Sequence, residues 1–328
     1  MIDRDSVLPR ITVCVPTRDR GASIKPSLDS LRQQEHDSYE VILVDQSVDD
    51  CSEETYRDAV GDDPRFHYIR SETTGKSVGC NIAIGRARGR IIAFTDDDCV
   101  APPNWLLDLE RALGENPSVG MVCAGVSPGP HDPRQGTIPA FIPPRPRVHR
   151  SPWLAFRAKG IGANVCVRAG LLRSVGGFDE VLGTGAPLRA GEDLDLVYRM
   201  LSAGQPVLDL PEPAVVHHGL RTWGPELRDL SWDSATSEGA TCMKRLRMGD
   251  VTILPSLLVL WFGRTVIWTN IVRGRRPTGL GRFVAFGRGM RLSFRYPVDR
   301  SSGRYRATSQ SAARPAGTGP ERPSAGTV

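Results

Sequence analysis

Four short apolar runs, separated by segments of helical periodicity, constrain the fold of this 328-residue chain more than any other feature. The runs are Ile11–Pro16, Val41–Val44, Phe66–Ile69 and Ile91–Thr95. Uncharged runs rich in β-branched residues are typical of parallel strands that are covered on both faces. Between the runs, Ile24, Leu28 and Leu31 fall on one helical face, and we expect a second helix over Ser77–Arg88. This β-α-β alternation predicts an α/β sheet.

Polar side chains stand at the carboxyl ends of three of these runs. Thr17 follows the first run, Asp45 the second and Asp96–Asp98 the fourth. In an α/β sheet the ligand crevice lies beyond the carboxyl ends of the strands. Three consecutive carboxylates repel one another unless a cation or strong donors lie among them, and Mg²⁺ or Mn²⁺ shared with phosphate oxygens would meet that need. The alternative is a solvated acidic turn that caps the next helix.

The composition, 40% hydrophobic and 24% charged, is that of a folded globular protein. Seven cysteines are scattered without a CxxC pair, so we expect reduced and mostly buried thiols. Residues 1–10 lack the apolar core of a signal peptide, which favours a cytoplasmic location.

Basic charge gathers at the C-terminus. The net charge is +5, but residues 264–328 hold 13 Arg against only Asp299 and Glu321, which gives +11 there and −6 for residues 1–263. Such a region could bind an anionic membrane surface. The alternatives are a solvated Arg-rich extension and nucleic-acid binding, of which the second is not expected.

One apolar segment, Val251–Gly263, raises the question of whether the chain contacts a membrane. Pro255 interrupts it and Arg264 follows it, so it falls short of the roughly 18 to 20 residues that a spanning helix needs. With Trp261, Trp268 and flanking arginines it could lie in the interface of a bilayer, which would place the protein at the inner face of the cell membrane. A buried helix of a small C-terminal region is the alternative, and the sequence leaves both open.

Further motifs in a fixed order add a resemblance to a known family. They are Ile11–Arg20 (ITVCVPTRDR), Val41–Asp45, Gly75–Asn81, Phe94–Val100, Pro103–Leu106, Gly162–Asn164, Val175–Glu180, Gly191–Asp195 and Val215–His218. Together they resemble the inverting family 2 glycosyltransferases of the GT-A fold, over about residues 9–220. Several motifs in the family's order are far more specific than any one of them.

The resemblance implies a domain organisation. Residues 1–220 would form a GT-A, Rossmann-like domain with a mixed, mostly parallel sheet flanked by helices. Within it, residues 127–152 are rich in Pro and Arg and are expected to form a long irregular loop. Residues 221–300 would form a C-terminal helical extension, which could associate with a membrane, and residues 301–328 have too few apolar residues to order themselves.

The resemblance also implies roles in nucleotide binding. Pro16 and Thr17 would line the nucleotide pocket, and Asp45 would accept a hydrogen bond from the base, with a turn-forming Asp as the alternative.

Two positions depart from the family pattern. Gln46–Val48 stands where many relatives have another acid and a Gly, and Cys80 stands where they often have Arg. Lys76 could replace a missing base or phosphate contact. The expected donor is a UDP-sugar.

The acidic run would hold the metal in such a protein. Asp96 would face the ribose or the metal, and Asp98 would ligate the metal that bridges the two phosphates. Asp97 would lie in the nucleotide-sugar pocket and help to set the turn. His217 rather than His218 would add a metal contact, since neighbouring side chains in a strand point to opposite faces. A partly buried His at a strand end is the alternative.

Glu192 and Asp193 open a predicted helix, where the helix dipole favours carboxylates in any case. The resemblance makes Asp193 the general base and Glu192 a contact of the nucleotide-sugar. Asp195 stands four residues before Arg199 and is expected to form an ion pair on the helix surface.

The implied activity is that of a hexosyltransferase-like enzyme, EC 2.4, as in polysaccharide biosynthesis. It would move a sugar from a nucleoside diphosphate to a hydroxyl of a glycan, a lipid-linked acceptor or a small molecule, assisted by Mg²⁺ or Mn²⁺ and with inversion. Two alternatives stay open. One is a catalytically silent sugar-nucleotide or glycan-binding protein on the same fold. The other is a sugar-phosphate nucleotidyltransferase. Such an enzyme would need a Gly-rich phosphate loop just after the first strand, and Pro16–Asp19 is not such a loop.

Overall fold

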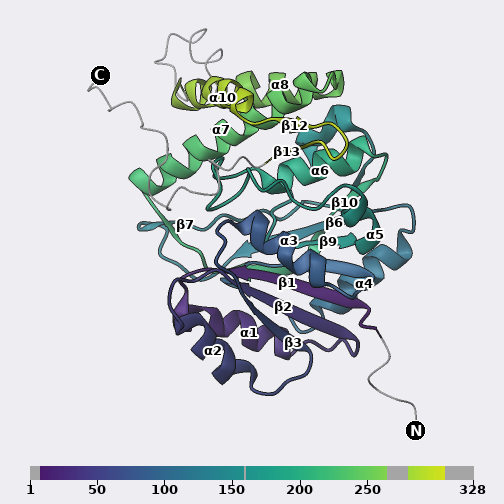
Figure 1. Cartoon of the computed structure of the whole chain (residues 1–328), viewed down its shortest axis with the longest axis vertical. Helices are drawn as coiled ribbons and strands as arrows, with labels where there is room; N and C mark the ends of the chain where they lie inside the picture. Colours follow the sequence, from purple (N-terminus) through teal and green to yellow (C-terminus); the bar gives the residue numbers. More distant parts are fainter. Residues whose placement is uncertain (1–7, 159, 264–279, 307–328) are drawn as a thin grey trace.

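The computed structural model describes residues 8–158, 160–263 and 280–306. Their main feature is a nine-stranded sheet in the order β3-β2-β1-β4-β9-β6-β10-β5, with β8 paired to β10 off this path (Figure 1). Its strands are β1 Ile11–Thr17, β2 Tyr39–Asp45, β3 Phe66–Arg70, β4 Ile91–Phe94, β5 Cys99–Val100, β6 Met121–Pro128, β8 Arg147–His149, β9 Val165–Arg168 and β10 Val207–His217.

Strands β1 to β4 form a parallel unit. β1 pairs in parallel with both β2 and β4, and β2 pairs in parallel with β3. β9 then lies antiparallel between β4 and β6, and β10 runs parallel to β6. The sheet is therefore mixed, and the four apolar runs of the sequence are its first four strands.

Helices cover both faces of the sheet. They are α1 Lys25–Arg32, α2 Cys51–Val60, α3 Lys76–Arg86, α4 Trp105–Glu115, α5 Ala169–Ser174 and α6 Glu192–Ser202, with the short 3₁₀ segments η1 Gly21–Ile24 and η2 Pro152–Arg157. Buried residues of α1, α2 and α4 pack with Val13 on one face, and those of α3, α5 and α6 pack with Cys14 on the other. Because neighbouring side chains of β1 enter different cores, the strand is uncharged and mostly apolar, and its buried Thr12 hydroxyl is satisfied by Glu40.

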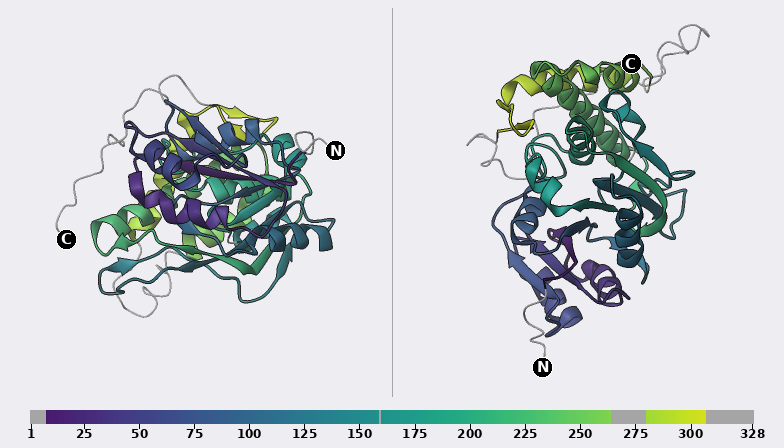
Figure 2. Two further views of the ribbon diagram at one scale, coloured as in Figure 1. Left: turned by 90° about the horizontal axis from the view of Figure 1, so that it is seen from below. Right: turned by 90° about the vertical axis from the view of Figure 1, so that its right-hand side faces the viewer.

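A group of C-terminal helices forms the far end of the molecule. They are α7 Pro225–Arg247, η3 Val251–Ile253, α8 Leu254–Leu258, the π-helical η4 Val259–Gly263, α10 Leu280–Leu292 and η5 Ser293–Arg295, followed by the hairpin of β12 Val298–Asp299 and β13 Arg304–Tyr305. Figure 1 and the right-hand view of Figure 2 place α8 and α10 at the end opposite to β1, β2 and β3.

Two segments expected to be irregular contain ordered strands. Within residues 127–152, β7 (Gly136–Thr137) pairs with β11 (Arg221–Thr222), and β8 pairs with β10. In the expected disordered tail, residues 301–306 are ordered, because Tyr305 is buried and its backbone N–H donates to Asp179 at 2.7 Å. Residues 307–328 lie outside the described part of the chain.

The described helices include none that is long and apolar enough to cross a membrane. The apolar segment 251–263 forms short helical turns, in which the Trp261 ring stacks on Phe283 and Phe286 of α10. The expected interfacial Trp268 lies outside the described residues. All seven cysteines are free and six are buried, as expected, with Cys51 exposed.

Glycines allow α7 and α10 to cross at close range. A Cβ added to Gly289 of α10 would lie 1.8 Å from the carbonyl oxygen of Thr236, and one added to Gly239 of α7 would lie 2.1 Å from that of Phe286. Both obstacles are backbone atoms, which cannot rotate away. The two helices can therefore keep this separation only with glycine at these positions.

We expect Gly289→Ala to lower the free energy of unfolding by about 1 to 3 kcal/mol, because the new methyl group forces α10 away from α7. The measurement is the urea midpoint followed by circular dichroism. Gly281→Ala on the same helix is the control, since a Cβ there meets nothing within 4 Å and alanine favours the helix by about 0.5 to 1 kcal/mol. Equal midpoints for the two variants would contradict this account of the crossing.

Candidate active site

Five carboxylates gather at the carboxyl edge of the parallel strands. Asp96, Asp97 and Asp98 follow β4, and Glu192 and Asp193 open α6; these five are referred to below as the acidic cluster. The two groups come from elements almost one hundred residues apart in sequence. Contacts of a single lysine show that the fold brings them together.

Lys76, the first residue of α3, lies between the two parts of the acidic cluster. Its Nζ is 2.5 Å from Asp96 Oδ1 and 3.8 Å from Glu192 Oε1, and its backbone N–H donates to Thr184 at 2.8 Å. Burial acts to lower the pKa of Lys76, but the charges of Asp96 and Glu192 outweigh it and raise that pKa well above its usual value. The ammonium group therefore stays charged at the centre of the site.

Asp193 is held by backbone donors. Its Oδ1 accepts from its neighbour Leu194 at 2.7 Å, and its Oδ2 accepts from Gly162 at 3.3 Å. Burial raises the pKa of Asp193, and burial together with the charge of Asp193 raises the pKa of Glu192 to about 7. Gly162 keeps the site compact, because a Cβ there would lie 3.7 Å from Asp193 Cβ and 3.6 Å from Lys76 Nζ. A carboxylate with a raised pKa is suited to accept a proton near neutral pH.

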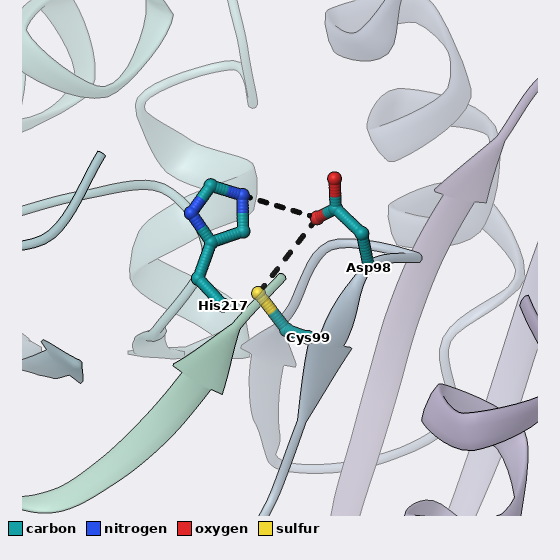
Figure 3. A group of neighbouring side chains, drawn as sticks. All are labelled: Asp98, Cys99 and His217. Carbon is teal, nitrogen blue, oxygen red and sulfur yellow. Dashed lines mark hydrogen bonds and ion pairs between the residues drawn. The ribbon is translucent and has the colours of Figure 1, made fainter. Parts of the chain in front are cut away.

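Asp98 and His217 face each other across the ends of β5 and β10 (Figure 3). Asp98 Oδ1 lies 3.2 Å from His217 Nε2 and 4.0 Å from Cys99 Sγ. His217 Nδ1 lies 2.8 Å from the carbonyl oxygen of Pro139, an acceptor that holds a proton on Nδ1 and directs Nε2 towards Asp98. Burial acts to lower the pKa of His217, but its hydrogen bond and charge interaction with Asp98 raise that pKa, so Nε2 donates to Asp98 and could bind a metal ion once it loses its proton. Burial acts to raise the pKa of Asp98, but its hydrogen bond and charge interaction with His217 and the charges of nearby cations lower it to about 2.

These donors fit a divalent metal ion. A carboxylate oxygen and an imidazole nitrogen suit Mg²⁺ and Mn²⁺, and the ligand atoms of Asp98, Cys99 and His217 lie within 4.8 Å of one another. Cys99 is the weakest of the three, because burial raises the pKa of its thiol and keeps it protonated. Asp98 and His217 are therefore the donors best placed for a metal, whereas Asp96, the other expected ligand, is outside this group and pairs with Lys76.

Arg20 was not assigned a role from the sequence, yet it pairs with the acidic cluster. Its Nη2 lies 3.1 Å from both Asp97 Oδ1 and Asp98 Oδ2. Asp97 also accepts from the Thr17 hydroxyl at 2.7 Å, and burial raises its pKa to about 6. The sequence held one signal for this contact. Arg20 follows β1 and the three acids follow β4, and these strands are parallel neighbours in the sheet, so the residues after them meet at one edge.

Asp45 and Pro16 lie at the expected strand ends but point into the protein. Asp45 is fully buried, and its oxygens accept from Ser47 N–H at 2.8 Å and from the Tyr68 hydroxyl at 2.7 Å. Pro16 is buried against α3, where a Cβ on Gly79 would lie 3.0 Å from Pro16 Cβ. The predicted contact of Asp45 with a base stays a prediction, since its carboxylate is already engaged by the protein.

Two neighbours of site residues turn away from the site. A Cβ on Gly129 would lie 2.7 Å from His218 Nδ1, so that ring packs by the β6 end while His217 faces Asp98. Asp195 does pair with Arg199, at 2.8 Å, but both side chains are buried. The expectation of a surface pair is therefore wrong. The (i, i+4) spacing predicts that two residues pair, but it does not predict whether they lie on the exposed or the buried face of the helix.

Comparisons with known proteins point to one family. Residues 12–174 match the model of a family described as glycosyl transferase family 2. A pre-mycofactocin glycosyltransferase of Mycobacterium tuberculosis is 27% identical over 291 residues, which cover 84% of this chain and 54% of the relative. The chain thus spans about half the length of that relative.

Solved structures share the fold. The mannosyltransferase PcManGT from Pyrobaculum calidifontis, in complex with GDP-Man and Mn²⁺, matches with a TM-score of 0.59 and 18% identity over 90% of this chain and 78% of that one. S. aureus TarS 1-349 matches with a TM-score of 0.51 and 18% identity over 69% and 64% of the two chains. At these identities the likeness concerns the fold, and it confirms the predicted GT-A class.

Gly219 offers a test of the Asp98–His217 pair as a metal site. A Cβ at this position would lie 2.7 Å from both Asp98 Oδ2 and His217 Nε2, so Gly219→Ala must displace them. We expect the affinity for Mn²⁺, measured by calorimetry, to fall by roughly 10-fold or more. Gly114→Ala on α4, where a Cβ meets nothing within 4 Å, should bind as the wild type does. Unchanged Mn²⁺ binding by Gly219→Ala would argue against this site.

Proposed function

The chain belongs to glycosyl transferase family 2, and from that premise we propose that it transfers a sugar from a nucleoside diphosphate to an acceptor hydroxyl with inversion. The observation that carries the proposal is the convergence of the acidic cluster around Lys76, next to the Asp98–His217 pair. This arrangement brings together a carboxylate suited to accept a proton, a lysine suited to bind phosphate, and a pair of residues suited to hold a metal ion.

Asp193 is the general base of the proposed reaction. The acceptor hydroxyl attacks the anomeric carbon as its proton passes to a carboxylate oxygen of Asp193, and the bond from the anomeric carbon to the diphosphate breaks. Its raised pKa favours proton uptake, and the Gly162 and Leu194 N–H groups hold its orientation. A single base with attack from the face opposite the leaving group inverts the anomeric centre.

Asp98 and His217, with Asp96, would hold a Mg²⁺ or Mn²⁺ ion. Bound there, such an ion supplies Lewis-acid stabilisation of the negative charge on the departing diphosphate. Lys76 and Arg20 add positive charge at the same edge, since each contacts a carboxylate of the acidic cluster. Their ammonium and guanidinium groups are suited to phosphate oxygens when a donor enters.

The proposed donor is a UDP-sugar. The internal bonds of Asp45 reduce its capacity to accept from a base, and Gln46 lies beside it with its amide 3.3 Å from the Thr73 hydroxyl. The donor panel of the activity assay should therefore contain GDP-sugars as well as UDP-sugars. Glycans, lipid-linked sugars and small molecules are the acceptor classes to screen.

The central prediction concerns Asp193→Asn. We expect its kcat for sugar transfer in Mn²⁺ to fall by about 10²- to 10⁴-fold, with a nearly unchanged donor KM, because the amide cannot take the acceptor's proton. The measurement is release of nucleoside diphosphate from a panel of donors and acceptors. Asp108→Asn is the matched control, since Asp108 also stands in the first turn of a helix, α4, but away from the site.

Other outcomes would exclude parts of the proposal. Wild-type turnover by a folded Asp193→Asn protein would remove the assignment of the base. Donor binding without release of nucleoside diphosphate from any donor would favour a silent binding protein. Release of pyrophosphate from a nucleoside triphosphate and a sugar phosphate would favour a nucleotidyltransferase.

We further propose that the end of the molecule formed by α8 and α10 meets an anionic membrane surface. Leu254 and Leu258 of α8 and Leu280 and Val284 of α10 are exposed, with 42% to 55% of each residue accessible. Residues 251–300 hold nine Arg against one acid, Asp299, so the charge suits anionic headgroups. Exposed apolar side chains beside positive charge are typical of interfacial binding.

Co-sedimentation with vesicles tests this surface. The full chain should bind vesicles rich in phosphatidylglycerol and should bind phosphatidylcholine vesicles weakly. The double variant Leu254→Asp/Leu258→Asp should lose most of this binding. Leu8→Asp, which changes a leucine near the N-terminus that is more exposed than either of them, should retain it. Absence of binding by the full chain to anionic vesicles would dismiss the proposal.

A further inference from the structure

A fully buried lysine of α7 bridges two carboxylates behind the active site. Lys244 Nζ lies 2.6 Å from Asp179 Oδ2 and 2.7 Å from Asp195 Oδ1, and none of the three side chains is accessible to solvent. Buried charges are costly unless they are closely paired, and removal of one partner is strongly destabilising. The geometry of this bridge is therefore tightly determined by the fold.

One arm of the bridge holds the start of α6. Asp195 stands two residues after Asp193, in the same helical turn, and accepts from Arg199 at 2.8 Å as well as pairing with Lys244. Burial acts to raise the pKa of Asp195, but the charges of Lys244 and Arg199 outweigh it and hold that pKa below its usual range. The ionised carboxylate ties the turn that carries Asp193 to α7.

The other arm holds the segment against which α3 begins. Asp179 accepts from the Val181 N–H at 3.1 Å, and this segment continues to Leu182 and Thr184. The Ser77 hydroxyl donates to Leu182 at 2.7 Å, and the Lys76 N–H donates to Thr184 at 2.8 Å. The start of α3, with Lys76, is thus fixed to the same buried cation as the start of α6.

We propose that Lys244 is a positioning residue for sugar transfer, which fixes Asp193 relative to Lys76 and hence to the donor site. The inference rests on the proposed function, in which Asp193 is the base. It makes helix α7, which lies beyond the part of the chain matched by the family, a member of the catalytic unit.

The expected signature separates turnover from donor binding. A displacement of about 1 Å between a base and its reacting atom can cost on the order of 100-fold in rate. Lys76 keeps its own ion pair with Asp96 and its backbone bond to Thr184 when the bridge is lost. The candidate metal donors Asp98 and His217 come from the β4–β5 turn and the end of β10, and the ion pairs of Lys244 are with Asp179 and Asp195 instead. Loss of the bridge should therefore lower kcat and leave the donor KM nearly unchanged.

The test uses the full chain with the double substitution Asp179→Asn/Lys244→Met. It removes one negative and one positive charge together and leaves the Asp195–Arg199 pair in place, so no charge loses its only partner. We expect kcat per folded molecule to fall roughly 10- to 100-fold with a donor KM within about 2-fold of wild type. The single variant Asp179→Asn, which is isosteric, gives the same readout if the double variant does not fold.

The matched control is Glu40→Gln/Arg88→Met. Arg88 Nε lies 2.7 Å from Glu40 Oε2, and Glu40 is buried near the start of β2, at the sheet edge opposite to the acidic cluster. This pair resembles the Lys244 bridge in its chemistry and in its buried carboxylate, although 53% of the Arg88 side chain is exposed. We expect its kcat per folded molecule to equal that of wild type, whatever its effect on the unfolding temperature.

Two results would overturn the inference. One is a wild-type kcat per folded molecule in the bridge variant, and the other is an equal fall of kcat in the control. Asp193→Asn, assayed in parallel, separates this inference from the proposed function. If Asp193→Asn is inactive and the bridge variant is fully active, only the positioning role fails; if Asp193→Asn is fully active, the assignment of the base fails.

Discussion

The acidic cluster governs the site, because five carboxylates at one sheet edge cannot all stay ionised without cations among them. Lys76 and Arg20 supply two positive charges, which leaves a formal charge of −3 when all five are ionised. The raised pKa values of Asp97, about 6, and Glu192, about 7, reflect burial first and then the charge of neighbouring acids. A site of this kind attracts cations and is suited to share them with phosphate oxygens.

The parallel unit explains why the cluster forms at this edge. β1, β2 and β4 run in the same direction, so the residues that follow them meet at one edge of the sheet. α6 is not part of that unit and follows β9, which runs antiparallel to β4. No strand register fixes the first turn of α6, and the ion pair of Lys244 with Asp195 ties that turn to α7 instead.

The sequence was informative where a local pattern determines the result. Apolar runs predicted β1 to β4, and the acids that follow them predicted the edge of the site. Arg20 and Lys244 were missed, because the partner of a charged residue is decided by tertiary contacts that have no sequence period. The same limit explains Asp195, whose spacing to Arg199 indicated a pair but could not indicate that α7 buries it. The order of residues 301–306 likewise depends on contacts distant in sequence, such as those of Tyr305 with Asp179 and Ala240.

The family match covers residues 12–174 and therefore ends before the proposed base. Thr17, Lys76 and the acids after β4 lie inside the matched part, whereas Asp193 and His217 lie beyond it. Most residues proposed to bind the sugar donor thus lie in the parallel unit, where strand pairing fixes their positions. The proposed base, which acts on the acceptor, lies on a later helix that a buried ion pair attaches to the rest of the protein. Because removal of one partner from a buried pair is strongly destabilising, a substitution of Lys244 requires matching changes at Asp179 and Asp195.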